Sequence, residues 1–536
     1  MLQKLRNVSD LLTISESRSS FIAANADEWT EFRDQSSDEW VLTDMALHFP
    51  EALVKFGVTS NYLASSVDAR LLGLLDYPID REATAVADSY GFDAIEYMTS
   101  KVYRPAVYIP AVRDAIGLYR GINSVEDLLD LEYDGILIGD LVYNTYLRQT
   151  GKGTLSTVEA DLFTYLLDAV SYKKGADRIF SSYNITNYLA SDLIYTRSGI
   201  PSRMAYQRGA DVFVVSESDL HNIRVHDRQQ LERHLDRPDI DIFEELYDTY
   251  GDHLTGLGEN YINDRMSAQV SEQPVGLAYA GSKRTISRDE LFEVSSLNPE
   301  NPTVVVMAHA FSDGPYRGER QLFRDYIVWM RETLSFAADH PDTNWVVKEH
   351  PRNDHFGSAD SVTALIDESI DRDAEHVFEF PEDVNTDSVA NFADVIVTFR
   401  GTAGWEFSCF GIPAVLAGMS EYSNFGFTYE PANQDEYFEL LADPGTLGPL
   451  EENRVRRAKA LFAFREHVMS LSTDYLPNIS EYETESEFWT EATDRIEGTT
   501  PMTDPGFKPH RKFVTEGLPH AVNTSEFARS STTASE

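Results

Sequence analysis

The sequence predicts an α/β protein built from two doubly wound, Rossmann-like domains. Three observations support this fold class. A chain of 536 residues is too long for one compact core, and its hydrophobic content of 42% is ordinary for a globular protein. Short β-branched runs alternate with helix-like segments over residues 302–416, and a sparser alternation covers residues 135–215.

The first half of the chain gives the weaker strand signals. Residues 1–130 read mostly as helices, such as residues 124–131, where a serine N-cap precedes an acidic first turn. We expect strands over residues 135–139 (GILIG), 178–187 and 212–215 (VFVV). The first of these strands ends at Asp140, which places a carboxylate at the edge where open α/β sheets hold their sites.

The second half shows a regular alternation of strands and helices. We expect strands over residues 302–307, 344–348, 376–380, 394–398 and 413–416, and helices over residues 321–338, 361–370 and 403–410. The connection between the domains falls within residues 265–300, where periodicity is weak. The expected division is therefore an N-terminal domain over residues 1–280, a C-terminal domain over residues 281–480, and a partly disordered extension over residues 481–536, which is rich in Thr, Ser and Pro near its end.

The charge of the chain limits its partners and its environment. It has 45 Lys and Arg against 89 Asp and Glu, a net charge of −44, with the acidic residues spread along the whole length. Such a surface repels the phosphate backbone, so a nucleic-acid partner is excluded. Scattered acidity is typical of a protein from a halophile, where molar salt screens the repulsion; an ordinary acidic protein is the alternative.

Targeting and cysteine signals are sparse. The first twelve residues lack the apolar stretch of a secretory signal, and no apolar run approaches the roughly 18 residues that span a bilayer. We therefore expect a cytoplasmic protein, for which peripheral contact with the inner face of the membrane is compatible. One cysteine, Cys409, rules out an internal disulfide and a cysteine-rich metal cluster.

The segment from 394 to 418, DVIVTFRGTAGWEFSCFGIPAVLAG, is the most informative. A β-branched strand leads through a turn of small residues into a helix, whose free N–H groups can hold a phosphate. Glu406 lies one turn into this helix, where it could accept hydrogen bonds from ribose hydroxyls. A plain strand-turn-helix with a capping threonine is the alternative. The candidate donor-binding residues of this turn are Arg400, Gly401, Thr402, Ala403, Gly404 and Glu406.

Two other loops follow predicted strands of the same domain. In VVKEHPR, His350 precedes a proline that holds it in extended geometry at the carboxyl edge of the sheet. It could donate to a donor phosphate or stabilise the leaving group; an ordinary loop histidine is the alternative. In AHAFSDGPYRGER, His309 and Arg317 crowd a Gly- and Pro-containing loop, which in a chain short of cations suggests an anion site; a solvated loop is the alternative.

The first domain offers a candidate acceptor site in GDLVYNTYLR. Asp140 could act as the general base that deprotonates an acceptor hydroxyl, or as a buried helix cap. Tyr143, Tyr146 and Arg148 follow it, and aromatic rings beside a carboxylate suit a sugar. We therefore place Asp140 and His350 as catalytic candidates and the other three as acceptor-binding candidates.

Taken together, VVKEHPR and TFRGTAGWEFSCFGIPAVLAG resemble the paired donor-site motifs of capsule-biosynthesis sugar transferases and other bacterial and archaeal surface-polysaccharide proteins. The pair is also similar to that of CDP-glycerol-type polyol-phosphate transferases and bacterial sialyltransferases. The turn followed by glutamate is similar to the nucleotide site of non-hydrolysing UDP-sugar 2-epimerases. The resemblance covers residues 300–425 and, more weakly, residues 133–148.

This resemblance implies the glycosyltransferase-B architecture, with two Rossmann-like domains facing across a cleft and no bound metal or other cofactor. It implies that His350 and the 400–404 turn hold the donor phosphates and that Glu406 holds the ribose. The sequence departs from many relatives, which have a serine pair in place of Gly401 and Thr402 and a smaller residue than Trp405. These departures leave the identity of the donor open.

The predicted function is that of a glycosyltransferase, which moves a sugar from a nucleotide-activated donor to a surface glycan, polysaccharide or lipid-linked acceptor. A CDP-polyol phosphotransferase, a nucleotide-sugar epimerase and a non-catalytic envelope-assembly protein remain as alternatives. The sequence leaves open the base and sugar of the donor, the acceptor, the stereochemical outcome and the oligomeric state.

Overall fold

The computed structural model describes residues 14–527, except residues 30–31, 33–35, 47–48, 77–80, 99–104, 216–219, 221, 234–236, 270–276, 280–281, 318–319, 354, 356, 371–373, 479–481, 483 and 525–526. The chain forms two compact units. Among the described residues, unit 1 comprises residues 14–142, 158–233 and 467–527, and unit 2 comprises residues 143–157 and 237–466.

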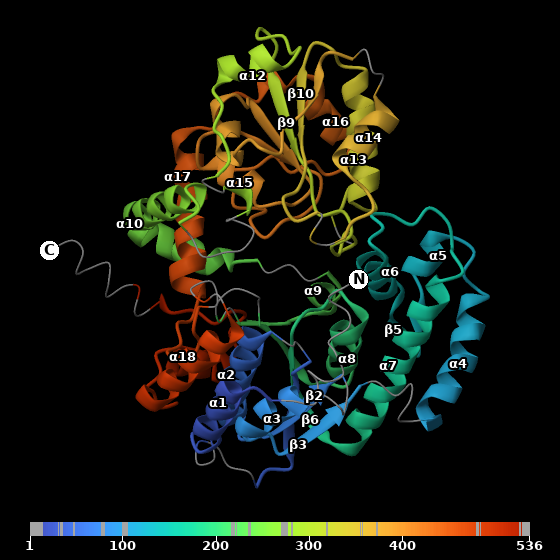
Figure 1. The fold of residues 1–536 in the computed structure, drawn as a ribbon, viewed down its shortest axis with the longest axis vertical. Coiled ribbons are helices and arrows are strands. Elements are labelled where there is room, and N and C mark those ends of the chain that lie inside the picture. Colours follow the sequence, from blue (N-terminus) through green and yellow to red (C-terminus); the bar gives the residue numbers. More distant parts are fainter. Residues whose placement is uncertain are drawn as a thin grey trace, which may run out of the picture. The chain divides into compact units, whose positions relative to one another are not determined.

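Unit 1 is built on a six-stranded sheet in the order β3-β2-β1-β6-β7-β8 (Figure 1). The five strands from β3 to β7 are parallel, and β8 runs antiparallel to β7 at the edge. The strands are β1 (Glu39–Asp44), β2 (Arg70–Leu75), β3 (Ala94–Tyr97), β6 (Asn184–Ala190), β7 (Asp211–Val215) and β8 (Asn222–Arg224). This is a doubly wound sheet, as predicted.

Helices from three separate stretches of chain surround this sheet. Between the strands lie α2 (Pro50–Val67), which opens with a proline at its first position, α3 (Arg81–Ser89), α7 (Leu162–Ser182) and α8 (Thr196–Gln207). The remaining helices of unit 1 are α1 (Glu16–Ala26), α4 (Pro105–Tyr119), α5 (Val125–Leu129), α9 (Arg228–Arg233), α18 (Glu485–Gly498) and α19 (Phe507–Thr515).

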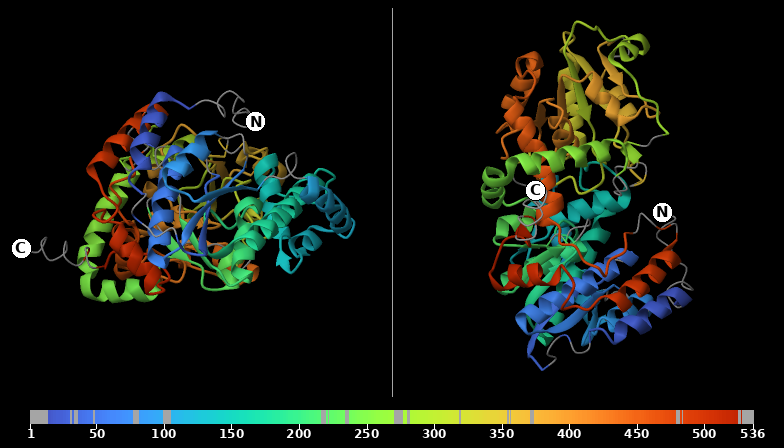
Figure 2. Two further views of the ribbon diagram at one scale, coloured as in Figure 1. Left: turned by 90° about the horizontal axis from the view of Figure 1, so that it is seen from below. Right: turned by 90° about the vertical axis from the view of Figure 1, so that its left-hand side faces the viewer.

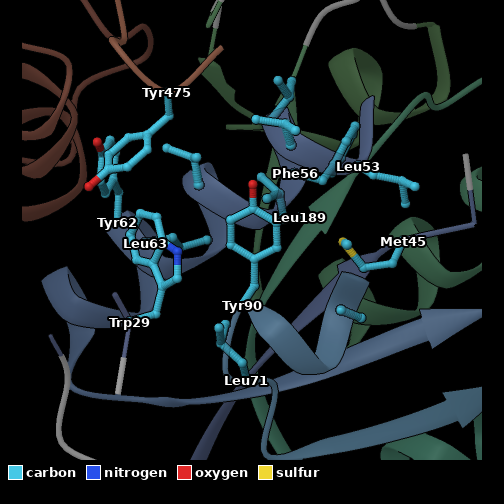
Figure 3. Close-up of a cluster of buried hydrophobic side chains, with 14 of the residues drawn as sticks. Trp29, Met45, Leu53, Phe56, Tyr62, Leu63, Leu71, Tyr90, Leu189 and Tyr475 are labelled. Carbon is cyan, nitrogen blue, oxygen red and sulfur yellow. The ribbon is translucent and has the colours of Figure 1, made fainter. Parts of the chain in front are cut away.

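The core of unit 1 contains side chains from both its N-terminal and its C-terminal stretch of chain. Side chains of α2, of the turns that follow α1 and α3, and of the sheet pack in one cluster with Tyr475; Trp29, Tyr62 and Tyr90 are among them (Figure 3). Trp489 on α18 lies fully buried in the same cluster, against Phe21 of α1. Figure 2 shows α18 alongside α1 in both views. The described part of the C-terminal segment is therefore a structural part of unit 1.

Unit 2 is built on a five-stranded, wholly parallel sheet in the order β11-β10-β9-β12-β13. Its strands are β9 (Thr303–Met307), β10 (Asn344–Lys348), β11 (Val377–Glu379), β12 (Val395–Thr398) and β13 (Ala414–Leu416). Alternate residues of β9 enter opposite clusters: Val304 and Val306 pack on one face of the sheet, and Val305 and Met307 on the other. Both faces are covered, which explains the unbroken apolar runs of these strands.

The helices of unit 2 begin at clear caps. Asp325 caps α13 (Tyr326–Ala338), and Ser287 and Glu290 form a capping box for α12 (Arg288–Val294). The others are α10 (Ile240–Met266), α14 (Val362–Ser369), α15 (Ala403–Ser408), α16 (Gln434–Ala442) and α17 (Glu452–Phe464). Short 3-10 turns lie at Thr386–Asn391 and Pro444–Thr446, and a π-helical turn at Arg465–Met469 follows α17.

The expected domain boundaries were wrong. The first unit ends before α10 rather than near residue 280, because α10 packs lengthwise on α17 of unit 2. Gly258 makes this contact possible, since a Cβ there would lie 1.8 Å from the carbonyl oxygen of Lys459. The expected extension over residues 481–536 is not separate either: its described helices belong to unit 1.

Several expected elements also differ. Residues 1–130, expected to be helical, contribute β1, β2 and β3. The strand expected over residues 135–139 is a two-residue strand, β5 (Ile136–Leu137), which pairs with β4 (Glu132–Tyr133) in a small hairpin, and Asp140 lies in the following helix α6 (Gly139–Thr150). The strand expected over residues 178–187 starts only at Asn184, because α7 continues to Ser182. The strands predicted for unit 2 are confirmed.

The structure also reports on membrane insertion. Among the helices of the described residues, none combines the length and the apolar character that crossing a bilayer requires.

Candidate anion-binding site

The candidate site of unit 2 lies where the strand order of its sheet reverses. β9 and β12 are neighbours, but the chain continues from β9 toward β10 on one side and from β12 toward β13 on the other. Loops that leave the carboxyl ends of two such strands diverge, and ligands of doubly wound sheets bind at this switch point. His309 follows the end of β9 by two residues, and Arg400 follows the end of β12 by two.

His309 connects these two loops directly. Its Nε2 accepts a hydrogen bond from the backbone N–H of Arg400 at 3.1 Å, and its ring stacks on Tyr326 with centroids 4.3 Å apart. Since Nε2 accepts, the neutral ring carries its proton on Nδ1, which remains a donor. Burial holds the pKa of His309 well below its usual value, and the nearby charges of His350, Arg400 and Arg317 lower it further.

His350 is held in the complementary tautomer on the loop after β10. Its Nδ1 accepts from the backbone N–H of Arg352 at 3.2 Å, so the neutral ring carries its proton on Nε2. Glu349 fixes the loop, because it accepts from the backbone N–H groups of His350 and Val362. Burial lowers the pKa of His350 to about 4, with Asp313 opposing this effect and the positive charges of neighbouring residues adding to it. Both histidines are therefore neutral near pH 7.

Arg400 is a half-buried cation without a counter-ion among the described residues. No carboxylate of the described residues forms an ion pair with it, and its Nε is buried without a hydrogen-bond partner. Its terminal nitrogen lies 3.4 Å from the carbonyl of Pro315 and 3.3 Å from Oε1 of Gln321. Burial lowers its pKa to about 10, the charge of Arg317 lowers it too, and Tyr326 works against this shift. An uncompensated half-buried cation is costly, so an anion would be held strongly here.

We call His309, Arg317, His350 and Arg400 the cation cluster; near pH 7 its positive charge comes from the two arginines, and the neutral histidines contribute ring N–H donors. The charge of Arg317 affects the pKa values of both His309 and Arg400, and the charge of His350 affects that of His309, so the four groups occupy one region. They come from the loops after three strands. These loops can meet because the carboxyl ends of parallel strands lie at one edge of the sheet.

The turn that leads into α15 is packed closely around this cluster. At Gly401 a Cβ would lie 3.0 Å from Oγ1 of Thr398 and 3.4 Å from Nε2 of His309. At Gly404 it would lie 2.5 Å from the hydroxyl of Tyr422. These two glycines therefore let the turn approach its neighbours.

Two further residues of the turn remain accessible. Thr402 and Ala403 are half-buried, and the hydroxyl of Thr402 makes no capping hydrogen bond to α15. That helix spans only six residues, shorter than the sequence indicated, so its dipole is a weak contributor to any anion site. The cation cluster is the stronger attraction for an anion.

The contacts of Glu406 differ from the predicted contact with a ribose. Its carboxylate is almost fully buried and accepts from Nε of Arg265 at 2.8 Å and from the hydroxyl of Tyr279. Both oxygens are thus engaged inside unit 2, where they fix the end of α10 against α15. The contacts of Glu406 are those of a structural residue.

Asp140 likewise lies in a closed arrangement within unit 1. Arg203 of α8 donates to both of its oxygens, at 2.7 and 2.6 Å, and both side chains are buried. A carboxylate paired in this way is out of contact with solvent, which disfavours it as a general base. The buried structural alternative fits these contacts.

The other three acceptor candidates, on the second half of α6, belong to unit 2. Tyr143 and Tyr146 are fully buried; the first donates to Asp325, and the second accepts from Lys152 at 2.9 Å. Their rings contact the protein interior rather than an open surface. Arg148 forms a long ion pair of 3.6 Å with Asp313, on the loop that carries Arg317.

Two residues that shape the site were not among the candidates from the sequence. Gln321 organises the loop after β9, because its amide donates to the carbonyls of Pro315 and Arg324 and its oxygen accepts from the backbone N–H of Arg317. Lys348 ends β10 almost fully buried, and burial lowers its pKa to about 8. An apolar strand ending in lysine could have indicated the second; nothing in the sequence pattern marks the first.

No family model and no curated protein matches this chain. Solved structures match it at low identity, among them KpsC of Thermosulfurimonas dismutans, a beta Kdo 2,4 transferase, at 15% identity over 52% of this chain and 88% of that chain, with a TM-score of 0.31. The O-GlcNAc transferase of Thermobaculum terrenum matches at 11% identity over 91% of this chain and 81% of that chain, with a TM-score of 0.26.

A third match is the UDP-GlcNAc 2-epimerase of Neisseria meningitidis bound to UDP-GlcNAc, at 9% identity over 86% of this chain and 98% of that chain, with a TM-score of 0.20. Both glycosyltransferases and UDP-GlcNAc 2-epimerases thus occur among the matching structures. Scores this low assign no function to this chain.

Proposed function

We propose that this protein is a glycosyltransferase and that unit 2 binds the phosphate groups of its nucleotide-sugar donor. The observation that carries the proposal is the cation cluster at the switch point, above all the half-buried guanidinium of Arg400, which has no counter-ion among the described residues. A guanidinium taken partly out of water without a counter-ion is costly, and a bound anion would offset that cost.

The geometry suits a phosphate that leaves during the reaction. Arginine binds phosphate oxygens through paired N–H groups, and Arg317 and Arg400 supply two guanidinium groups. His309 and His350 each keep one ring N–H as a donor while neutral. When the bond between the sugar and the phosphate breaks, negative charge grows on the phosphate, and donors placed there beforehand stabilise it.

The acceptor side of the proposal is less specific. We propose a surface glycan, polysaccharide or lipid-linked acceptor, and a cytoplasmic, high-salt setting that the scattered negative charge favours. The reaction needs no metal in this proposal. Among the described residues, no three or more His, Cys, Asp or Glu side chains are grouped as a metal site would require.

The first experiment is a thermal-shift panel of CMP, CDP, UDP and GDP in molar KCl. A nucleotide that binds the native state raises the melting temperature as its concentration increases, by an amount equivalent to about 2.7 kcal/mol at a hundred times Kd. We expect at least one nucleotide to act in this way, and Arg317→Ala to abolish the shift. Arg331→Ala is the matched control, since Arg331 of α13 pairs with Glu368 of α14 at the surface.

The nucleotide that binds indicates which sugar nucleotides to use as donors in a product analysis. Transfer to a glycoside with release of the nucleotide supports the proposal. A phosphodiester product with release of CMP identifies a polyol-phosphate transferase, and isomerisation of the nucleotide sugar without an acceptor identifies an epimerase. If none of the four nucleotides shifts the melting temperature at millimolar concentration, the proposed donor site is refuted.

A further inference from the structure

A second pair of arginines lies near the cation cluster in unit 2. Arg320 is on the loop between β9 and α13, and Arg237 lies three residues before the start of α10. Both side chains reach the loop that follows β13. Nη2 of Arg237 donates to the carbonyl oxygen of Ser423 at 3.1 Å. Nη1 of Arg320 donates to Oδ1 of the next residue, Asn424, at 3.2 Å. We call Arg237 and Arg320 the second arginine pair.

Among the described residues, one carboxylate is placed to offset the charge of this pair. Oε2 of Glu430 lies 3.7 Å from Nη2 of Arg320, and the charge of Glu430 also acts on Arg237. The other oxygen of Glu430 accepts from the backbone N–H of Asn424 at 2.8 Å and from the hydroxyl of Thr428 at 3.0 Å. One negative charge therefore faces two positive charges, and the pair keeps a net positive charge.

Arg237 is the less well satisfied member of the pair. It is half-buried, and its Nε is buried without a hydrogen-bond partner among the described residues. Its Nη1 lies 3.8 Å from the sulfur of Met419, which is a weak acceptor. Burial lowers the pKa of Arg237, Glu430 works against this shift, and the charge of Arg320 adds to it. A bound anion would supply both the missing acceptor and the missing charge.

A short pairing of two loop segments joins this pair to the cation cluster. Gln321, which directly follows the second arginine of the pair, forms an antiparallel bridge with Gly418. Oε1 of Gln321 lies 3.3 Å from a terminal nitrogen of Arg400. Met419, which directly follows Gly418, contacts Arg237. The two groups of cations are therefore neighbours within unit 2, so one extended ligand can contact both.

This arrangement matches the charges of one class of sugar nucleotide. In the proposed function the cation cluster holds the phosphate groups, and the sugar is attached directly to a phosphate. A neutral sugar offers hydroxyl groups, which leave the charge of an arginine uncompensated. The carboxylate of a uronic acid compensates it, because guanidinium groups bind carboxylates through paired N–H donors.

We propose that the second arginine pair binds an acidic group on the sugar of the donor, so that the sugar that this protein transfers is itself acidic. This inference rests on the proposed function, because it takes the donor phosphates to lie on the cation cluster. Arg237 supplies the half-buried charge, and Arg320, which is exposed, supplies a second guanidinium group. The pair then selects sugars by charge, because a neutral sugar leaves Arg237 without an anion and an acidic sugar does not.

Matched sugar nucleotides test the preference for an acidic sugar. On the base that the nucleotide panel selects, the nucleoside diphosphate derivatives of glucose and glucuronate differ only in a hydroxymethyl group against a carboxylate. Those of galactose and galacturonate form a second such pair. Isothermal titration calorimetry in molar KCl measures the four dissociation constants. We expect the acidic member of at least one pair to bind about tenfold more tightly than its neutral counterpart. Equal affinities within both pairs would overturn the inference.

Substitutions assign this preference to the arginines. Arg237→Met and Arg320→Met should each lower the preference for the acidic sugar to about threefold or less, while the affinity for the bare nucleotide stays within about twofold. Arg237→Lys keeps the positive charge without the paired donors, so it should retain part of the preference. Arg331→Met, which removes a surface ion pair with Glu368, is the matched control and should keep the full preference.

The failures of the two proposals differ. If no nucleotide binds, the proposed function falls. If the bare nucleotide binds but Arg237→Met weakens it as much as it weakens the acidic sugar nucleotide, the pair holds the phosphates of the nucleotide, and the assignment to an acidic sugar is wrong. If Arg237→Met does not fold, as circular dichroism would show, Arg320→Met decides: an unchanged preference overturns the assignment.

Discussion

Replacing Arg400 by methionine should stabilise the nucleotide-free protein and abolish nucleotide binding. A pKa lowered to about 10 from the usual 12.5 means that the charged side chain is held in place at a cost of roughly 3 kcal/mol. Because the unfolded chain has the higher pKa, this cost is present at neutral pH. Methionine removes the charge and keeps contact with the rings of Tyr326 and Phe399, over which the guanidinium now lies.

The expected gain is smaller than this cost. The lost contacts of the guanidinium with the two rings are worth about 0.5–2 kcal/mol, which leaves a net stabilisation of about 1–2 kcal/mol. At about 2–4 °C per kcal/mol for a unit of this size, the melting temperature without nucleotide should rise by about 2–8 °C. The thermal shift caused by the selected nucleotide should vanish.

Differential scanning calorimetry with and without nucleotide measures both effects in one series, with Arg331→Met as the control. The exposed pair of Arg331 and Glu368 contributes little, so that variant should behave as the wild type. A lower melting temperature for Arg400→Met together with an unchanged nucleotide shift would show that Arg400 is an ordinary packing residue, and the argument for the cation cluster would fail.

Three further outcomes are expected. Bound phosphate should raise the pKa of His350 from about 4, so nucleotide affinity should increase as the pH falls from 7 toward 4 and level off below pH 4. Calorimetric titration in two buffers of different ionisation enthalpy would detect the proton uptake on binding. A binding enthalpy that is the same in both buffers would contradict this expectation. Asp140→Asn should lower the free energy of unfolding by about 3–5 kcal/mol, measured by urea unfolding, because Arg203 would be left buried and unpaired. A loss of turnover with unchanged stability would instead support Asp140 as a catalytic residue. Raising KCl from 0.1 M to 2 M should increase the melting temperature, because salt screens the repulsion of 44 excess negative charges. A melting temperature that does not change with KCl would refute the halophilic interpretation.

The strands of unit 2 could be predicted from the sequence, whereas only β6 and β7 of the six-stranded sheet of unit 1 were predicted. Strands buried on both faces become unbroken β-branched runs, such as TVVVM and VIVT, that no amphipathic helix would contain. Among the missed strands, β2 (RLLGLL) is leucine-rich, and leucine favours helices. Another missed strand, β1, pairs with β6, more than 100 residues away in the chain.

The same distinction explains which candidate residues the structure brings together and which it buries in ion pairs elsewhere. His309, His350 and Arg400 follow parallel strands, and the topology alone brings the ends of those strands to one edge. Glu406 and Asp140 each lie in the first turn of a helix, where the pattern does not tell an open site from a buried ion pair. Their partners, Arg265 and Arg203, are 141 and 63 residues away in sequence, a separation that no local motif records.

The path of the chain determines when the core of unit 1 can be completed during synthesis. Unit 1 is composed of three stretches, and the last of them supplies α18 and α19, whose aromatic side chains fill its core. A ribosome therefore releases every strand of both sheets before it releases the residues that close the core of unit 1. Until then the apolar surfaces of α1 and α2 lack their cover, and exposed apolar surface of this kind favours aggregation and chaperone binding in the cell. Truncation before residue 467 would make that exposure permanent.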